Sequence, residues 1–259
     1  MKKTVAVILL VMTCAMESFA QADILVWQGR IANRMLKVDS VSFFAPPSDK
    51  HDYVDLGLPS GLKWATCNIG TNESFGYGDY FAWGEVVPKD EFGWNTYKFM
   101  AEGKSSRSFV TKYTVDDDEK KKNGIWYENG IFVGDSLTKL HPEDDVATAI
   151  WGSEWRMPTK NEWMELYDNC DWEWTRSYNG TCVAGYIGTS KTNGNTIFLP
   201  AAGYNGLFYS KYEFNERGNY WTSELCDSGS AWYLRIFDGM YISSEDRSQG
   251  FSVRAVVVE

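Results

Sequence analysis

The sequence predicts an α+β fold with mostly antiparallel strands. Two helical patterns lie close together between residues 142 and 170, and strand-like runs fill the parts of the chain before and after them. Strands grouped on either side of a helical segment, and separated by Gly- and Asn-rich turns, are typical of α+β proteins. The 259 residues fit one large domain, or one domain with an appendage, and contain no internal repeat.

The N-terminal residues are typical of a secretory signal peptide. The basic pair Lys2-Lys3 precedes an apolar run over residues 4–16, and small residues lead up to Ala20. We therefore expect removal of residues 1–20 and export to the periplasm, the cell surface or the medium. The apolar run is shorter than the ~20 residues of a membrane span, and no later segment suits a transmembrane helix. Lipidation of Cys14 is the alternative interpretation.

Residues 21–50 predict a small β-hairpin followed by a linker. Two strand-like runs, Ile24–Gln28 and Leu36–Phe44, flank a polar turn region, and a Pro pair at residues 46–47 ends the second run. The main domain is expected to cover residues 51–259.

The main domain begins with two predicted strands and a long irregular connection. The strands are Tyr53–Leu56 and Leu62–Cys67, and turn residues separate them. The connection extends to about residue 113. Three of its rings are expected to pack into the core, namely Trp94, Tyr97 and Phe99.

A second hairpin is predicted from Ile125 to Val133. Asn129-Gly130 separates two apolar runs there, and this dipeptide is a strong signal for a two-residue hairpin turn. The acidic and basic run over residues 116–122 lacks the spaced oxygen ligands and the central Gly of a calcium loop, so a solvated loop is expected.

The first predicted helix has an acidic first turn. Pro142 is expected at the first helical position, and residues 143–145 place negative charge where the helix dipole favours it. Gly152 is the expected stop. The apolar side of this helix is expected to consist of Val146, Ala149 and Ile150.

The second predicted helix begins with a capping box. Thr159 is the expected N-cap, and Glu162 three positions later is its reciprocal partner. The apolar stripe of this helix is expected to be Trp163, Leu166, Tyr167 and Cys170. The Trp-rich extended link before Thr159 is expected to seat both helices against the sheet.

The remaining chain predicts a series of short strands. Asn-Gly and Asp-Gly turns separate them. The candidates are Tyr186-Ile187, Thr196–Leu199, Tyr220–Ser223, Ala231–Phe237, Met240–Ser243 and Ser252–Val258.

Several motifs resemble the fibrobacter succinogenes major paralogous domain family. Together they span residues 53–258, and their combination is specific. They are Tyr53–Asn68 (YVDLGLPSGLKWATCN), Gly78–Glu85 (GDYFAWGE), Glu143–Ala147 (EDDVA), Trp155–Thr159 (WRMPT), Ile197–Gly203 (IFLPAAG), Tyr220–Ser223 (YWTS) and Gly250–Arg254 (GFSVR). The N-terminal hairpin is similar to a segment that often precedes this domain in exported proteins of gut Bacteroidota.

The resemblance implies a C-type-lectin-like fold, related to the formylglycine-generating-enzyme superfamily. It implies no activity, because most members of the family have no known function. The chain lacks the Glu-Pro-Asn, Gln-Pro-Asp and Trp-Asn-Asp calcium motifs of sugar-binding C-type lectins. It also lacks the Gly-Asn-Val-x-Glu-Trp motif and the C-terminal cysteine pair of the formylglycine-generating enzymes. The insertion over residues 105–133 is longer than the usual spacer of the family.

Four cysteines follow the predicted leader. An even count in an exported chain suggests two disulfides, with three possible connectivities. We expect Cys67 to pair with Cys170 and Cys182 with Cys226, and free thiols are the alternative. None of the four is spaced C-x-x-C, so neither a zinc site nor a redox motif is indicated.

The composition disfavours several partners and reactions. The net charge of −10 argues against a nucleic-acid or anionic-membrane surface. The two histidines, His51 and His141, are poorly placed for nucleophilic catalysis or zinc binding. Two acidic pairs, Asp144 with Asp145 and Asp79 with Glu85, leave a two-carboxylate hydrolase possible in principle, since separation in space decides that mechanism. No cofactor or metal is expected.

Aromatic residues make up 16% of the chain, including 12 Trp and 15 Tyr. These rings either pack long loops into the core or form a binding face, and composition favours the first. Strand Ala231–Phe237 illustrates the choice, because Trp232, Leu234 and Ile236 alternate with Tyr233, Arg235 and Phe237, and at least one set must be buried.

The C-terminal loops are the best candidate for a binding site. Lectin-like folds present ligand-binding loops on one side, and residues 205–219 and 238–249 combine rings with a few charges. The candidate ligand-binding residues are Phe208, Tyr209, Tyr212, Tyr241, Asp246 and Arg247.

The sequence therefore favours a non-enzymatic binding or adhesion module over an enzyme. The expected ligand is a glycan or a surface protein. A carboxylate-based hydrolase or modifying enzyme and a structural component of a surface assembly are the alternatives, and the oligomeric state stays open.

Overall fold

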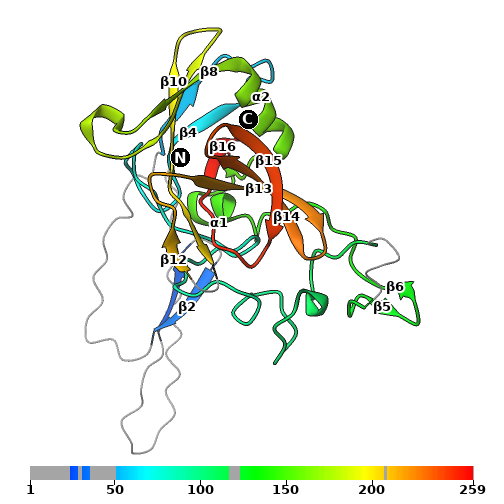
Figure 1. The fold of residues 1–259 in the computed structure, drawn as a ribbon. Helices are drawn as coiled ribbons and strands as arrows, with labels where there is room; N and C mark the ends of the chain where they lie inside the picture. Colours follow the sequence, from blue (N-terminus) through cyan, green and yellow to red (C-terminus); the bar gives the residue numbers. More distant parts are fainter. Residues whose placement is uncertain (1–23, 29–30, 36–50, 117–122, 207–208, 259) are drawn as a thin grey trace, which may run out of the picture. The chain divides into compact units, whose positions relative to one another are not determined.

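The computed structural model describes residues 24–28, 31–35, 51–116, 123–206 and 209–258 (Figure 1). The chain divides into two compact units, Met1–Asp49 and Lys50–Glu259. The predicted signal peptide and most of the predicted linker lie outside the described residues.

The first unit contains a two-stranded antiparallel sheet. Strand β1 (Ile24–Gln28) pairs with β2 (Ile31–Met35), and Gln28 lies opposite Ile31. The first strand is the predicted one, whereas the expected second strand, Leu36–Phe44, lies outside the described residues. Strand β1 therefore takes its partner from a nearer segment than expected, because two residues are enough to connect antiparallel strands.

The second unit has the α+β character that the sequence predicts, with several small, antiparallel sheets and two short helices. A four-stranded sheet with the order β3-β4-β16-β7 joins strands from the beginning and the end of this unit. Every neighbouring pair in this sheet is antiparallel. Its strands are β3 (Tyr53–Asp55), β4 (Lys63–Asn68), β16 (Arg254–Val257) and β7 (Trp155–Arg156).

Two three-stranded antiparallel sheets follow the helices. One has the order β13-β14-β15 and consists of β13 (Gly218–Asp227), β14 (Ser230–Ile236) and β15 (Met240–Asp246). The other has the order β10-β9-β8 and consists of β8 (Cys170–Thr175), β9 (Gly185–Ser190) and β10 (Thr196–Pro200). Strand β8 was not predicted, because it continues directly from a helix without a turn residue between them.

Helix α1 (Val146–Trp151) begins later than the sequence suggests. Its N-cap is Asp145, so Pro142 and the first two acidic residues precede the helix instead of forming its first turn. The buried residues are Val146 and Ala147, whereas Ile150 is exposed. The predicted apolar side was therefore partly wrong, because this six-residue helix buries only residues of its first turn, and its later residues are half-buried or exposed. The stop at Gly152, with φ of 98°, is confirmed.

Helix α2 (Lys160–Asn169) forms with the predicted capping box. The Thr159 side chain accepts from the Glu162 N–H, and the Glu162 carboxylate accepts from the Thr159 N–H. Of the predicted stripe, Trp163 and Leu166 are buried in the helix, Tyr167 is exposed, and Cys170 begins β8 instead. The helix lies against β14 and β15.

Long irregular connections carry most of the remaining chain, with 3₁₀ turns at Arg107–Phe109 and Tyr178–Gly180. The predicted hairpin at Asn129-Gly130 is confirmed as β5 (Tyr127–Glu128) and β6 (Ile131–Phe132). A further short hairpin, β11 (Tyr204–Gly206) with β12 (Tyr209–Tyr212), forms where only a loop was expected.

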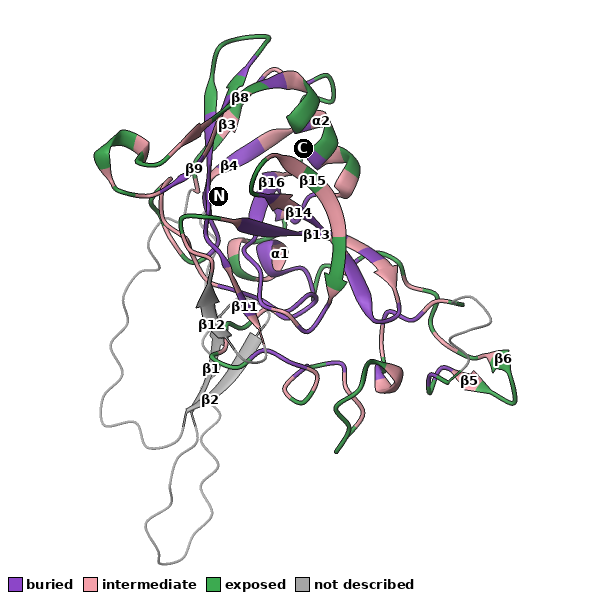
Figure 2. Ribbon diagram, in the orientation of Figure 1, coloured by how far each residue is buried: buried purple, intermediate pink, exposed green. Residues whose placement is uncertain are grey.

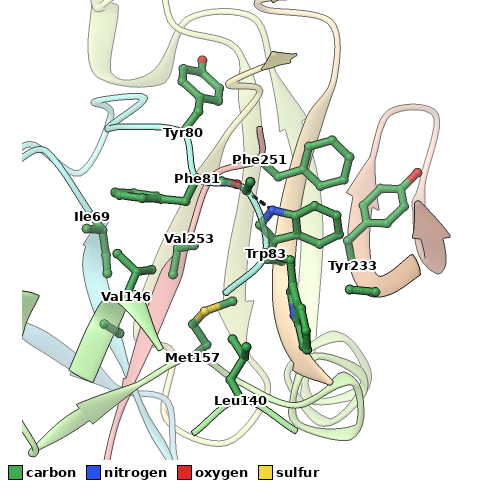
Figure 3. Close-up of a cluster of buried hydrophobic side chains, with 14 of the residues drawn as sticks. Ile69, Tyr80, Phe81, Trp83, Leu140, Val146, Met157, Tyr233, Phe251 and Val253 are labelled. Carbon is green, nitrogen blue, oxygen red and sulfur yellow. Dashed lines mark hydrogen bonds between the residues drawn. The ribbon is translucent and has the colours of Figure 1, made fainter. Parts of the chain in front are cut away.

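Two clusters of buried side chains form the core, and β14 contributes to both (Figure 2). Ala231 and Tyr233 belong to the first cluster, and Leu234 and Ile236 to the second. Both faces of β14 therefore contribute to the core, although neither expected set is wholly buried, because Trp232 and Arg235 are half-buried and Phe237 is exposed. The first cluster gathers rings from the long connection and the C-terminal strands around Trp83 (Figure 3).

A fully buried arginine connects the four-stranded sheet with β10. Arg254 Nε donates to Asn68 Oδ1 at 2.9 Å, and the guanidinium also donates to the carbonyls of Ala65 and Phe198, each at 3.1 Å. Two of these acceptors lie on β4 and the third on β10, so one side chain links three strands that are distant in the sequence, β4, β10 and its own β16.

Candidate functional site

An open groove of about 500 Å³ lies at one end of the two three-stranded sheets. Its volume falls within the range of small-molecule and cofactor sites. Four segments contribute to it: the end of β8, the residue before β9, the loop before β13 and the turn between β14 and β15. The lining residues are Trp174, Arg176, Ala184, Asn215, Glu216, Phe237 and Asp238.

The Trp174 side of the groove is built on β8, which is the edge strand of its sheet. Trp174 lies directly opposite Tyr186 of β9, and the two rings meet edge to face with centroids 5.0 Å apart. Two positions earlier, the ring of Trp172 covers Gly188, where a Cβ atom would lie 2.6 Å from it. Cross-strand packing therefore fixes the indole of Trp174 while leaving it partly open to solvent.

The Phe237 side of the groove lies at the turn after β14. The ring of Phe237 is 42% exposed. The guanidinium carbons of Arg217 and Arg235 lie 5.3 and 5.7 Å from its centroid, which is within cation–π distance. Arg217 is also paired with Glu213 at 2.7 Å. Phe237 is thus an exposed ring held in place by two charged neighbours.

Asp238 and Tyr241 form a hydrogen-bonded pair beside this ring. The Tyr241 hydroxyl donates to Asp238 Oδ1. This hydrogen bond lowers the pKa of Asp238 and raises the pKa of Tyr241. Asp238 is therefore ionised at neutral pH and presents a negative charge to the groove.

Asn215 lies in the loop before β13 and has a φ of 58°. Its Oδ1 accepts two hydrogen bonds, from the Ala184 N–H at 2.8 Å and from the Tyr77 hydroxyl at 2.7 Å. The ring of Tyr77 stacks on Phe214 at 5.1 Å. The side chain of Asn215 is thus held from two directions.

Two further charged side chains line the groove without internal partners. Arg176 and Glu216 are exposed, and neither side chain makes an ion pair or a hydrogen bond with the described residues. The groove therefore combines two rings with free donors and free acceptors. Such a mixture suits a ligand that has apolar faces and many hydroxyl or amide groups.

The structure brings only part of the predicted site to this groove. Tyr241 is 43% exposed and bonds to the groove residue Asp238. Phe208 lies outside the described residues, and Tyr209 and Tyr212 belong to β12, of which only the backbone is described. Asp246 accepts from Trp94 Nε1 at 3.3 Å and lies 3.9 Å from Arg107, so it helps to hold the long connection.

Arg247 does not belong to any exposed loop, and its expected role in ligand binding is incompatible with its position. The side chain is 0% exposed and donates to the Tyr97 hydroxyl and to three backbone carbonyls. Its guanidinium also lies within 6.0 Å of three ring centroids, those of Trp83, Tyr97 and Tyr113. Arg247 therefore stabilises the first core cluster instead of binding a ligand.

None of the seven lining residues was among the named candidates, and four of them lie outside the two loop ranges, namely Trp174, Arg176, Ala184 and Phe237. The first had a signal in the sequence, because Asp171 to Trp174 alternates acidic and aromatic residues as an edge strand does. Asn215, Glu216 and Asp238 lie within the two loop ranges that the sequence singled out, although none was named.

The expected disulfides do not form in the structure. Among the described residues, Cys67, Cys170, Cys182 and Cys226 make no disulfide bond. Cys67 and Cys170 are buried, and burial raises the pKa of both thiols, that of Cys170 to about 11. Such thiols are poor nucleophiles. Cys182 is exposed.

Three of the four carboxylates considered for catalysis have structural roles. Asp145 accepts from the N–H groups of Ala147, Thr148 and Met157, and burial raises its pKa to about 6. Asp144 accepts from Lys98, Lys112 and the Tyr113 hydroxyl at 2.6–2.7 Å.

Glu85 has a similar structural role. It pairs with Lys89 at 2.8 Å and accepts from the N–H of Lys98. The described residues contain no group of three His, Cys, Asp or Glu side chains that could hold a metal ion.

Comparisons of this chain with protein-family models, with curated proteins and with solved structures find no match. None of the described helices has the length and apolar character needed to cross a membrane. The groove is therefore the feature from which a function can be inferred.

Proposed function

We propose that the protein is an exported glycan-binding module that acts without catalysis, and that the groove beside β8 is its binding site. The observation that supports this proposal is the combination of two partly exposed rings, Trp174 and Phe237, with free donors and acceptors in one groove. Sugars present C–H faces that stack on rings, and hydroxyl groups that both donate and accept hydrogen bonds. The groove meets each of these requirements.

The proposal includes a C-type-lectin-like fold within the major paralogous domain family. Its support is the set of motifs from residue 53 to residue 254, together with the arrangement of small antiparallel sheets and two short helices. Export is supported by the signal-peptide pattern of residues 1–20.

The charges around the groove favour a ligand without large net charge. Arg176 lies with Glu216 and Asp238 in the lining, and Arg217 and Arg235 lie close to Phe237. Because both signs are interspersed, neither a strongly acidic nor a strongly basic polymer gains from long-range attraction. A neutral oligosaccharide fits this balance.

A glycan array tests the proposal. The wild-type protein is expected to bind a defined group of glycans, and a Trp174→Ala, Phe237→Ala double variant is expected to lose this binding. Tyr53→Ala is the matched control, because Tyr53 is 52% exposed on β3 and does not line the groove. Unchanged binding by the double variant would rule out the groove as the site.

A carboxylate-based hydrolase is the second candidate function. Glu216 and Asp238 line the same groove as the two rings, and paired carboxylates beside a stacked sugar are the apparatus of glycosidases. Incubation of bound glycans with the wild-type protein and with a Glu216→Gln variant distinguishes the two functions. Release of shorter sugars by the wild-type protein alone would establish the enzyme.

A further inference from the structure

The side-chain amide of Asn215 has a defined orientation. The backbone N–H of Ala184 can only donate, so the Asn215 atom 2.8 Å from it must be the oxygen Oδ1. The Tyr77 hydroxyl donates to the same oxygen. Because Oδ1 is fully used, the Nδ2 group carries the free hydrogen-bonding capacity of this side chain, and it makes no hydrogen bond with the described residues.

This orientation is fixed from the core of the domain. Asn68 Nδ2 donates a hydrogen bond to the backbone carbonyl of Tyr77 at 3.0 Å, and Asn68 Oδ1 accepts one from the buried Arg254. The chain of hydrogen bonds therefore runs from Arg254 through Asn68 and Tyr77 to Asn215 at the groove. An amide held in this way presents its two N–H donors without an entropic cost of ordering at binding.

Three kinds of group line the groove together. The Nδ2 of Asn215 is a donor, and the carboxylate of the next residue, Glu216, is an acceptor. Ala184, bonded to Asn215 through its N–H, and the ring of Phe237 supply apolar surface. A simple hydroxyl group uses the donor or the acceptor but gains nothing from the apolar surface.

An acetamido group matches all three features. Its carbonyl oxygen accepts, its N–H donates and its methyl group is apolar. We propose that the groove selects glycans that carry N-acetylated sugars, with Asn215 as the specificity-determining donor and Tyr77 as its positioning residue. This inference rests on the proposed glycan-binding function and names the ligand class of the same groove.

Calorimetric titration of matched trisaccharides tests the proposal. Chitotriose and cellotriose share the same linkage and differ in the acetamido or hydroxyl group at C2, and the trimer of glucosamine has an amine there. The wild-type protein is expected to bind chitotriose about tenfold more tightly than the other two, which corresponds to about one net hydrogen bond.

The Asn215→Asp variant separates specificity from folding. The substitution keeps Oδ1 as an acceptor for Ala184 and Tyr77 but removes the N–H donors. The preference for chitotriose over cellotriose is expected to fall to within about twofold. Asn72→Asp is the matched control, because Asn72 is exposed and does not line the groove, and it is expected to keep the full preference.

The Tyr77→Phe variant tests the positioning role. Loss of the hydroxyl leaves one hydrogen bond on Asn215 Oδ1 and lets the amide turn. Chitotriose affinity is expected to fall about threefold while cellotriose affinity stays the same, because only the donor is affected. A purely structural role would lower both affinities by the same factor.

Three results would overturn the acetamido assignment. They are equal binding of chitotriose and cellotriose by the wild-type protein, an undiminished preference in Asn215→Asp, and no binding of chitotriose. Equal binding that disappears in the Trp174→Ala, Phe237→Ala variant would contradict this inference alone and leave the proposed function standing. Glycan binding that survives in that double variant would contradict the proposed function.

Discussion

The Tyr77 hydroxyl donates to Oδ1 of Asn215 at 2.7 Å across 138 residues of sequence. This contact joins the Gly-rich loop after β4 to the loop before β13, and it is one step in the chain of hydrogen bonds that begins at Arg254. A binding loop anchored in this way is ordered before its ligand arrives, which reduces the entropic cost of binding.

Replacement by methionine is expected to destabilise the protein at Arg247 and to have little effect on its stability at Arg176. Arg247→Met leaves buried carbonyls of Lys112, Tyr113 and Ser228 without their donor, so the free energy of unfolding is expected to fall by about 2–4 kcal/mol. Arg176→Met is expected to change the free energy of unfolding by less than about 0.5 kcal/mol, because the side chain is exposed and makes no ion pair with the described residues. Urea unfolding of both variants measures the difference, and equal stability would contradict the structural role of Arg247.

Asp144 is expected to stabilise the fold only above acidic pH. Burial opposes its ionisation, but hydrogen bonds from Lys112, Lys98 and Tyr113 outweigh this effect and lower its pKa. A carboxylate with a lowered pKa contributes fully above its unfolded value of about 3.9, and this contribution is lost as the pH falls through the folded pKa.

The Asp144→Asn variant measures this contribution. At pH 7 its free energy of unfolding is expected to lie about 2 kcal/mol below the wild-type value, because Lys98, Lys112 and the Tyr113 hydroxyl lose a charged hydrogen-bond acceptor. The difference is expected to shrink below about pH 4, and a difference that stays constant down to pH 2 would show that Asp144 is not the titrating group.

The capping box of α2 is expected to contribute measurably to stability. Thr159→Ala removes the acceptor for the Glu162 N–H, which typically lowers the free energy of unfolding by about 1 kcal/mol. Thr196→Ala is the matched control, because Thr196 is an exposed residue of β10 and makes no side-chain hydrogen bond with the described residues. Thermal unfolding of the two variants should differ, and equal midpoints would contradict the capping role.

The cysteines are expected to react with alkylating reagents according to burial. Cys182 is exposed and should be labelled in the folded protein, whereas Cys67 and Cys170 should be labelled only after unfolding, because they are buried and have raised pKa values. Mass spectrometry of digested protein reads out both states. A linked peptide containing Cys67 and Cys170 would restore the disulfide that the sequence suggested.

Local signals in the sequence account for much of the fold. The capping box at Thr159, the turn at Asn129-Gly130 and the strands on either side of residues 57–61 all form as predicted. Each depends on neighbouring residues, whose chemistry is visible in the sequence. The start of α1 was placed too early because three successive acids satisfy the same dipole preference, and only the contacts of Asp145 show which one is the N-cap.

The candidate site was harder to predict because its residues come from four separate segments. The sequence identified two loop ranges that contribute Asn215, Glu216 and Asp238, but it did not show that Trp174 and Phe237 lie beside them. The role of Arg247 was also hidden, since a charged residue that follows Glu245 and Asp246 gives no local sign of burial. Its hydrogen-bond acceptors lie up to 150 positions away.

A crystal structure of the protein with a bound glycan would show directly whether the groove is the binding site. We expect a sugar ring stacked on Trp174 or Phe237, with a sugar oxygen within hydrogen-bond distance of Asn215 Nδ2. A sugar bound elsewhere, for example on the β11–β12 hairpin, with the groove empty, would contradict this expectation.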